Sequence, residues 1–279
     1  ETRNKLDKSL KLLQKIIKQK IIKFKNIVKL GKTHLKDAVP ISFSQEYSGY
    51  LSQINQSRNE INRTLKNLYY IPIGGTCVGT GLNTKDNFDK KVVAKLKNIS
   101  GLNLKVSRNK FKDISTHDDI LTYTSALNRL AVSLIKISND INLASSGPMS
   151  GFNEIIMPIN EIGSSSMPGK FNNSTCEMIS SLALKTINVH QLVTSALTHS
   201  YFQLNVYKPL IINEILNIIN LLSEGITIFS LHTLKHIKPN IEKTKSDLDS
   251  SFVKYTKLTP ILGYQFLSNL YQKSKKNKK

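Results

Sequence analysis

The sequence contains little cysteine and few acidic residues, and each shortage narrows the classes of protein it can encode. Cys77 and Cys176 are the only cysteines. They are too few and too far apart for a disulfide framework or a cysteine-based zinc site. We therefore expect a reducing compartment. Acidic residues number 19 against 40 lysines and arginines, which leaves a formal net charge of +21.

This excess of positive charge would indicate a nucleic-acid partner if it formed an aromatic-interleaved patch or a known binding motif. The lysines are instead spread over the polar faces of the expected helices. The run Lys273–Lys279 is expected to be a solvated tail, with contact to an anionic surface as the alternative. We expect no nucleic-acid partner.

The chain also lacks an uninterrupted apolar run that could span a bilayer. Its most apolar stretch, Pro209–Leu231, contains Asn213, Glu214 and Glu224, which are costly in a membrane. No apolar leader follows a basic start after Glu1, so no secretory signal is expected in these residues. A soluble protein with no membrane partner is predicted.

Helical periodicity is what the sequence has in abundance. Apolar residues recur at three- and four-residue spacing over 6–28, 47–68 and 127–141. Three further segments are also expected to be helices: 174–198, 206–232 and 241–257. Helices of this length each need a packing partner along the whole apolar stripe. The predicted fold class is therefore mostly α, a long-helix bundle.

Short breaks rich in glycine and proline separate these helices, at 31–43, 71–84 and 146–172. In the last break, Gly163–Asn172 reads Gly-Ser-Ser-Ser-Met-Pro-Gly-Lys-Phe-Asn and leads into a helix. The N-terminus of that helix, the Lys170 ammonium group and the loop N–H groups all favour an anion at one point. The sequence therefore predicts a site for a carboxylate or a phosphate in this loop.

This loop resembles the Gly-Ser-Ser-x-Met-Pro-x-Lys-x-Asn signature of the fumarase/aspartase superfamily. Gly31–Pro40 and Gly74–Thr84 are similar to two further segments of the same family, in the same order. His34 and Gly169 match class II fumarases, because aspartases have glutamine at the first position and usually alanine at the second. The resemblance extends from near residue 1 to about Tyr264.

The resemblance implies a domain organisation and an assembly. Residues 1–237 would form the central helical-bundle domain with its catalytic loops, and 238–279 the start of a small C-terminal helical domain with a basic tail. In the family, four subunits associate through the central domain, and each active site collects residues from three chains. A homotetramer is therefore the expected assembly.

The activity that the resemblance implies is the reversible hydration of fumarate, a small dicarboxylate, to L-malate by general acid and base chemistry. By resemblance, Ser164 would take the proton from carbon; the residues alone leave Ser165 and Ser166 open as alternatives. His34 would protonate the leaving hydroxide, since imidazole titrates at about 6.5. Glu177 would hold His34, or would form a helix capping box with Ser174, and the two roles can coexist.

The remaining site residues bind substrate. Lys170 and Asn172 are suited to the substrate carboxylate, and Thr33 to a substrate oxygen. No metal and no organic cofactor are expected. His232 and His236 lie four apart on one helix face, but no third ligand is evident, and solvated surface positions are the favoured interpretation.

Two departures from the family stand out. Asn173 occupies a position where fumarases usually have proline. Nothing in the chain matches the family's N-terminal serine- and asparagine-rich segment, which binds a substrate carboxylate. The chain is then a fragment or a degraded copy, with a fragment favoured, and by itself it is expected to be inactive.

Other functions remain open from sequence. An aspartase-like ammonia-lyase is the first alternative, and a non-catalytic basic helical binding module is the second. The expected location is the cytoplasm, with the mitochondrial matrix as the alternative.

Overall fold

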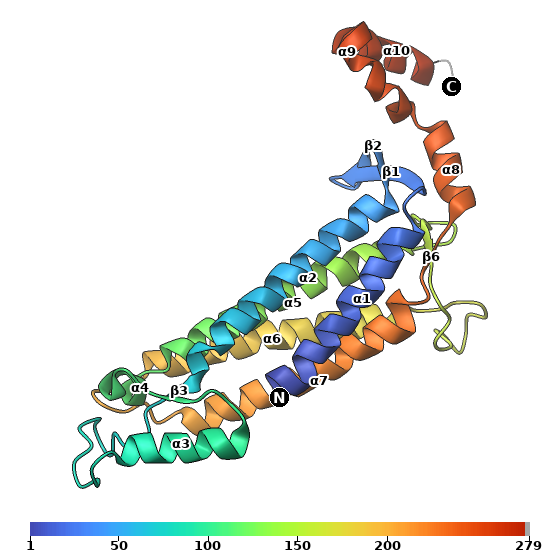
Figure 1. Ribbon diagram of the computed structural model, residues 1–279. Coiled ribbons are helices and arrows are strands. Elements are labelled where there is room, and N and C mark those ends of the chain that lie inside the picture. The colour runs from blue at the N-terminus through green and yellow to red at the C-terminus, as the bar shows by residue number, and fades with distance from the viewer. Residues whose placement is uncertain (277–279) are drawn as a thin grey trace. The chain divides into compact units, whose positions relative to one another are not determined.

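The computed structural model describes residues 1–276, and the last three residues of the expected basic tail lie outside the described part. The helices are η1 (Thr2–Leu6), α1 (Asp7–Lys23), α2 (Phe43–Leu65), η2 (Asn67–Tyr69), α3 (Phe88–Ser100), α4 (Lys110–Ser115), α5 (Asp118–Ala144), α6 (Ser174–Thr198), α7 (Lys208–Ile228), η3 (Phe229–Leu234), α8 (Ile241–Ser250), η4 (Phe252–Leu258), α9 (Thr259–Leu262) and α10 (Tyr264–Lys276). The strands are β1 (Val28–Thr33), β2 (Lys36–Ser42), β3 (Tyr70–Ile71), β4 (Lys105–Val106), β5 (Ile155–Ile156) and β6 (Lys238–Pro239). The expected mostly-α fold with long helices is confirmed (Figure 1).

The chain forms two compact units, each assembled from separate segments. Unit 1 comprises Glu1–Gln14, Ser52–Asn139 and Ser174–Phe229. Unit 2 comprises Lys15–Leu51, Asp140–Asn173 and the residues from Ser230 onward. The division at residues 237 and 238 stays a prediction about domain organisation.

Unit 1 is built around packed helices, of which α6 and α7 lie side by side (Figure 1). The buried residues of α6 recur every three or four positions, as in the series Ile179, Ala183, Thr186 and Val189, so one face is covered along its length. At Gly225 of α7 the two helices approach closely, and a Cβ there would lie 2.3 Å from Leu182 Cδ1. A side chain at this position would have to displace Leu182.

The segment Lys208–Leu234 is long and apolar enough to cross a membrane by length and composition alone. Half of its most apolar window is buried inside the protein. Ile211, Ile218 and Leu222 of α7 are each at most 2% exposed. This is the behaviour of a core helix whose apolar face packs against its neighbours.

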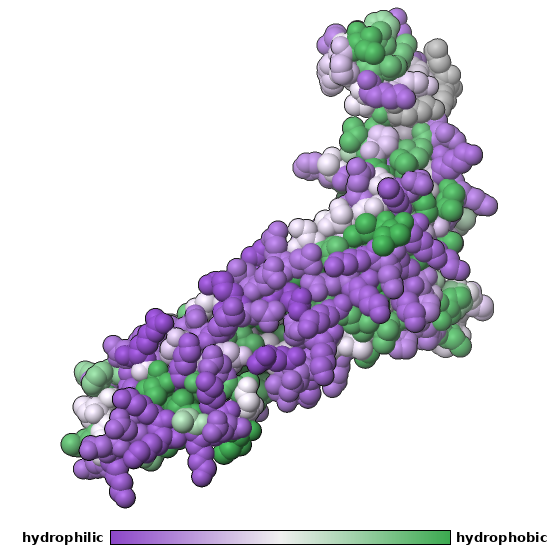
Figure 2. Space-filling view, in the orientation of Figure 1, coloured by the Kyte–Doolittle hydropathy of each residue, from purple (hydrophilic) through white to green (hydrophobic). Residues whose placement is uncertain are grey.

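Some apolar side chains of unit 1 remain on the surface. Figure 2 shows hydrophilic residues over most of one face of the molecule, with smaller hydrophobic patches among them. Val132 of α5, Leu184 of α6 and Ile212 of α7 are 56%, 55% and 50% exposed. Each of these three long helices thus presents apolar surface to water.

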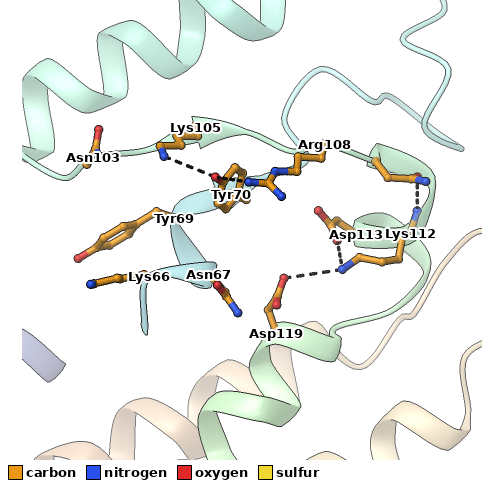
Figure 3. Close-up of a pocket in the computed structure, with 11 residues that line it drawn as sticks. Lys66, Asn67, Tyr69, Tyr70, Asn103, Lys105, Arg108, Lys112, Asp113 and Asp119 are labelled. Carbon is orange, nitrogen blue, oxygen red and sulfur yellow. Dashed lines mark hydrogen bonds and ion pairs between the residues drawn. The ribbon is translucent and has the colours of Figure 1, made fainter. Parts of the chain in front are cut away.

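At one end of unit 1, β3 pairs with β4 in parallel, with Tyr70 opposite Lys105 and Ile71 opposite Val106. The loops around this pair and around α4 line a cavity of about 660 Å³ (Figure 3). Neither α3 nor α4 was expected from the apolar periodicity.

Unit 2 carries an antiparallel hairpin of β1 and β2, and β5 pairs with β6. Beside the hairpin, the Phe24 ring packs edge-on against Phe43 and Tyr47, with ring centroids 6.2 and 5.7 Å away. Lys20 is buried nearby and donates to the carbonyl groups of Lys235 and Ile237, at 2.9 and 2.8 Å.

Several expected helix boundaries were wrong, three of them helix ends described below, although the helix expected over 174–198 is confirmed as α6. The first helix ends at Lys23 rather than Val28, because pairing with β2 draws Val28 into strand β1. The second ends at Leu65, and Leu68 lies in η2. The helix expected over 241–257 stops at Ser250, because Ser251 is extended and its hydroxyl caps η4 by accepting from the Val253 N–H.

The close approach at Gly225 gives a test of the helix packing. Replacing Gly225 with valine should lower the free energy of unfolding by about 1–3 kcal/mol, because the side chain overpacks the contact with Leu182. Gly49→Ala is the matched control: nothing lies within 4 Å of a Cβ there, and alanine in a helix should raise stability by about 0.5–1 kcal/mol. Urea unfolding followed by circular dichroism measures both; equal stability of the two variants would contradict the packing.

Candidate active site

The tip of the β1–β2 hairpin carries Thr33 and His34. Thr33 pairs with Lys36, so His34 and Leu35 form a two-residue turn. Both turn residues have positive φ, 52° and 57°, as a type I′ hairpin turn requires. Leucine rarely adopts this backbone region, so Leu35 is strained, and such strain is concentrated at functional sites. The imidazole of His34 is presented to solvent at the tip.

The serine loop is closed by hydrogen bonds between its two ends. The Gly163 N–H donates to the Lys170 carbonyl at 3.0 Å, and the Asn172 side-chain amide donates to the Gly163 carbonyl at 3.1 Å. A Cβ on Gly163 would lie 2.6 Å from the Lys170 carbonyl oxygen, so the closure needs glycine at this position. The closed ends hold Ser164 through Gly169 as one loop.

Within this loop, Ser164 differs from the other two serines. Its Oγ accepts hydrogen bonds from the backbone N–H groups of Met167 and Ser166, at 3.2 and 3.3 Å. Ser164 is half-buried, whereas Ser165 and Ser166 are exposed. N–H donors fixed on an oxygen stabilise negative charge there. The geometry thus separates Ser164 from Ser165 and Ser166, which sequence reasoning alone did not.

Helix α6 begins at Ser174, directly after the loop, and Asn173 fixes the chain ahead of it. The Asn173 side-chain amide donates to Asn142 Oδ1 and to Ser145 Oγ, both at 2.7 Å. These two hydrogen bonds provide a restraint at the position where the family usually has proline. Glu177 lies in the first turn of α6 with an exposed side chain, and its pairing with His34 stays a prediction.

The two expected substrate-binding residues of the loop are both exposed to solvent. Lys170 contributes only its backbone to the loop closure: its N–H donates to the Met167 carbonyl at 3.2 Å. Asn172 uses one amide hydrogen to close the loop. The Lys170 ammonium group is therefore left on the open side of the loop, where an anion can reach it.

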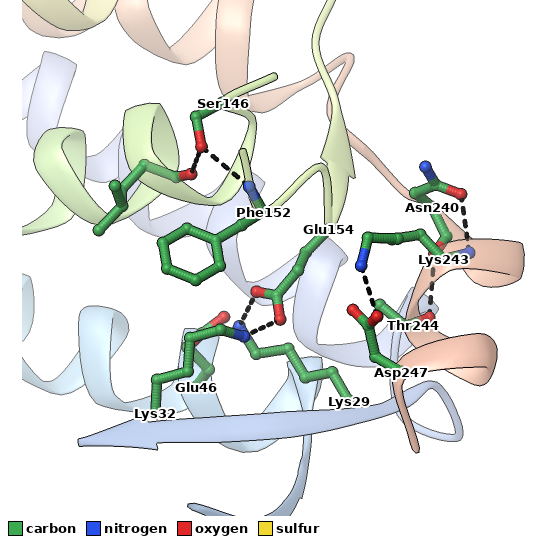
Figure 4. Close-up of polar contacts among 11 residues, drawn as sticks. Lys29, Lys32, Glu46, Ser146, Phe152, Glu154, Asn240, Lys243, Thr244 and Asp247 are labelled. Atoms are coloured by element: carbon green, nitrogen blue, oxygen red, sulfur yellow. Dashed lines mark hydrogen bonds and ion pairs between the residues drawn. The ribbon is translucent and has the colours of Figure 1, made fainter. Parts of the chain in front are cut away.

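A buried ionic cluster, missed by sequence reasoning, ties the hairpin to the segment that leads into the serine loop. Lys29 Nζ lies 2.9 Å from Glu154 Oε2 and 2.8 Å from Glu46 Oε1, and Lys32 also pairs with Glu154. The side chains of Glu154 and Lys29 are only 4% and 5% exposed. Figure 4 shows the Glu154 carboxylate facing both lysines.

The backbone of Glu154 is held as firmly as its side chain. Its N–H donates to the Ala144 carbonyl at 2.7 Å, and its carbonyl accepts from the Asn240 N–H at 2.8 Å. Burial by itself would lower the pKa of Lys29, but the carboxylates of Glu46 and Glu154 outweigh it and raise that pKa. Since Lys32 is two residues before His34, the cluster fixes the base of the turn that carries the imidazole.

Cys176, His232 and His236 are not arranged as nucleophiles or metal ligands. Cys176 is buried, and burial raises the pKa of its thiol to about 12, so the thiolate is not formed near neutral pH. His232 and His236 are exposed, as expected for solvated positions. Among residues 1–276, no group of three or more histidine, cysteine, aspartate or glutamate side chains is arranged to hold a metal ion.

The sequence and the structure of this chain were compared with those of known proteins. The family model described as Lyase matches residues 1–187. The mitochondrial fumarate hydratase of Schizosaccharomyces pombe is 40% identical over 270 residues, which cover 97% of this chain and 52% of that protein. The class II fumarate hydratase of Brucella suis is 38% identical over 277 residues, covering 99% of this chain and 60% of that protein.

A solved structure matches as well. The crystal structure of class II fumarase from Schistosoma mansoni superposes with a TM-score of 0.94 at 35% identity, covering 100% of this chain and 61% of that one. The chain belongs to this lyase family, and the relatives that it matches over nearly its whole length include class II fumarases. It spans between 52% and 60% of the length of these two curated relatives.

The buried cluster predicts a large effect on stability. Glu154→Gln should lower the free energy of unfolding by about 3–5 kcal/mol, because it leaves a buried lysine short of one carboxylate and Lys32 without its partner. Glu161→Gln, at an exposed carboxylate in the same segment, is the control and should change stability by less than about 0.5 kcal/mol. Chemical denaturation measures both variants, and similar midpoints would show that the cluster contributes little.

Proposed function

We propose that the full-length protein containing this chain is a fumarate hydratase that interconverts fumarate and L-malate. One observation carries the proposal: Ser164 Oγ accepts from two backbone N–H groups in a loop that Lys170 closes with its carbonyl, in a chain 40% identical to a fumarate hydratase. The chemistry requires a group that takes a proton from a carbon next to a carboxylate, together with positive charge near that carboxylate.

In the dehydration direction, Ser164 removes the proton from the carbon next to one carboxylate. The N–H groups on its oxygen lower the cost of the alkoxide that must form. Charge then develops on the adjacent substrate carboxylate. Lys170 and Asn172 are the groups proposed to bind that carboxylate, and their exposure leaves them accessible to it.

At the neighbouring carbon, the leaving hydroxide needs a proton, and His34 is the proposed donor. Its place at the tip of a fixed hairpin aims an imidazole outward on a short, restrained turn. Thr33 is proposed to hydrogen-bond a substrate oxygen, and Glu177 to orient His34. In the assembled protein, we propose, the hairpin residues and the serine-loop residues come from different subunits and meet in one site.

A homotetramer is the proposed assembly, with a small dicarboxylate as substrate. Exposed apolar side chains on α5, α6 and α7 support self-association, because surface of this kind is commonly covered by a partner. The proposed location is the cytoplasm, with the mitochondrial matrix as the alternative. The Schizosaccharomyces pombe relative is named as mitochondrial, and the Brucella suis relative is bacterial.

Activity is tested by the loss of fumarate absorbance in the full-length protein, with water alone and with added ammonia. His34→Asn should lower kcat by about 10²–10⁴ with little change in KM, because an amide keeps a hydrogen bond but cannot deliver a proton. His236→Asn, at an exposed histidine, is the control. Turnover that depends on ammonia, or more than half of wild-type turnover in His34→Asn, would contradict the proposal.

Assembly is tested by the mass measured in light scattering. The chain should form an oligomer, and the double variant Leu184→Glu with Ile212→Glu should shift the mass toward the monomer, since it places charge on apolar surface that a partner would cover. Ile99→Glu, at a side chain of α3 that is 75% exposed, is the control. A monomeric wild-type chain would refute self-association.

A further inference from the structure

The cavity beside β3 and β4 in unit 1 holds more positive charge than its carboxylates neutralise. Its one internally paired cation, Lys112, lies 3.0 Å from Asp113 and 3.7 Å from Asp119. Lys66, Lys105 and Arg108 also line the cavity, and within residues 1–276 none of these three has a carboxylate partner. Uncompensated cations gathered around a cavity attract an anion.

Two of these cations converge on a single oxygen. Lys105 Nζ and Arg108 Nη2 both donate to the Tyr70 hydroxyl, at 3.4 and 3.1 Å. Both also lie over the Tyr70 ring, 5.3 and 5.0 Å from its centroid. Figure 3 shows the lysine and arginine side chains meeting at this phenol. The hydrogen bonds from Arg108 and Lys105 lower the pKa of Tyr70, so the local field favours negative charge at that point.

The backbone that carries these groups is fixed before any ligand arrives. Pairing of β3 with β4 sets Tyr70 opposite Lys105. Next to the pair, the buried Ser107 N–H donates to the Ile71 carbonyl at 2.9 Å, and the Ser107 hydroxyl donates to Asp113 and accepts from the Asn109 N–H. A site held in this way loses little entropy on binding.

The other wall of the cavity has a different character. Asp113 and Asp119 supply carboxylate oxygens that accept hydrogen bonds, and their shared partner Lys112 balances part of their charge. In Figure 3, Asn67 and Asp119 lie across from Tyr70 and Arg108. This wall suits hydroxyl groups and repels a second anionic group. A dicarboxylate such as fumarate therefore fits the cavity poorly.

We propose that this cavity binds a small phosphorylated sugar, with its phosphate at Lys105 and Arg108 and its hydroxyls toward Asp119 and Asn67. A guanidinium fork and an ammonium group that share one focus match a tetrahedral dianion. The volume of about 660 Å³ lies within the range of about 300–1,000 Å³ found for small-molecule sites. None of the residues proposed for fumarate hydration lines this cavity.

Isothermal titration calorimetry on the 279-residue chain at low salt tests the proposal with three probes. Ribose 5-phosphate should bind, inorganic phosphate should bind about tenfold more weakly because it lacks the hydroxyl contacts, and ribose should give no measurable heat. Inorganic phosphate binding as tightly as ribose 5-phosphate would overturn the sugar assignment. No heat with ribose 5-phosphate at millimolar concentration would overturn the site.

Matched variants separate the site from general electrostatics. Lys105→Gln with Arg108→Gln should weaken ribose 5-phosphate binding by about tenfold or more, since both phosphate contacts are lost. Lys91→Gln with Lys95→Gln removes the same net charge from exposed positions of α3 outside the cavity and should change the affinity by less than about twofold. Circular dichroism checks that both variants are folded, and equal losses would show that only net charge matters.

The side of the cavity formed by Asp113 and Asp119 is tested separately, by comparing the two phosphate probes on one variant. Asp119→Asn should weaken ribose 5-phosphate while leaving inorganic phosphate unchanged or slightly tighter, because it removes a strong hydroxyl acceptor and one repulsive charge. A parallel loss for both probes would contradict the proposed orientation of the ligand.

Discussion

The buried carboxylate of Glu154 is the interaction on which the arrangement of unit 2 depends. Two lysines of strand β1 pair with it, and its backbone groups bond to Ala144 and Asn240. A buried charge is costly unless it is fully paired, so the cluster forms as a whole or not at all. It therefore links the hairpin that carries His34 to the chain that continues into the serine loop.

The serine loop is held by a different device, main-chain closure between Gly163 and the Lys170–Asn172 end. This closure gives Ser164 two N–H donors while the neighbouring lysine side chain faces solvent. The residues proposed for catalysis thus lie on restrained backbone, while most of their side chains are exposed to solvent. Such presentation fits a site that is completed by other subunits, as proposed for the assembled protein.

Part of the positive charge of the chain is concentrated at one cavity. The lysines look evenly spread in sequence, yet Lys105 and Arg108 meet at Tyr70 because β3 and β4 pair across a gap of more than thirty residues, and Lys66 lines the same cavity. The segments around β3 and β4 supply the cations, hydrogen bonds of the buried Ser107 hold the backbone next to Arg108, and Asp113 and Asp119 line the other side of the cavity. Composition could not reveal this local concentration of charge.

By itself, the sequence determined the mostly-α class, the extent of α6 and the segments that carry the proposed chemistry. Apolar periodicity and short motifs are local properties, and they survive folding unchanged. Tertiary structure decided the rest. Val28 left the first helix because it pairs with Ser42 in the β1–β2 hairpin, and Lys29 became a buried ion-pair residue because Glu154, far along the chain, lies beside it. Nothing within a few residues of either position encodes those partners, since pairing free energy depends on neighbours brought together only by the fold.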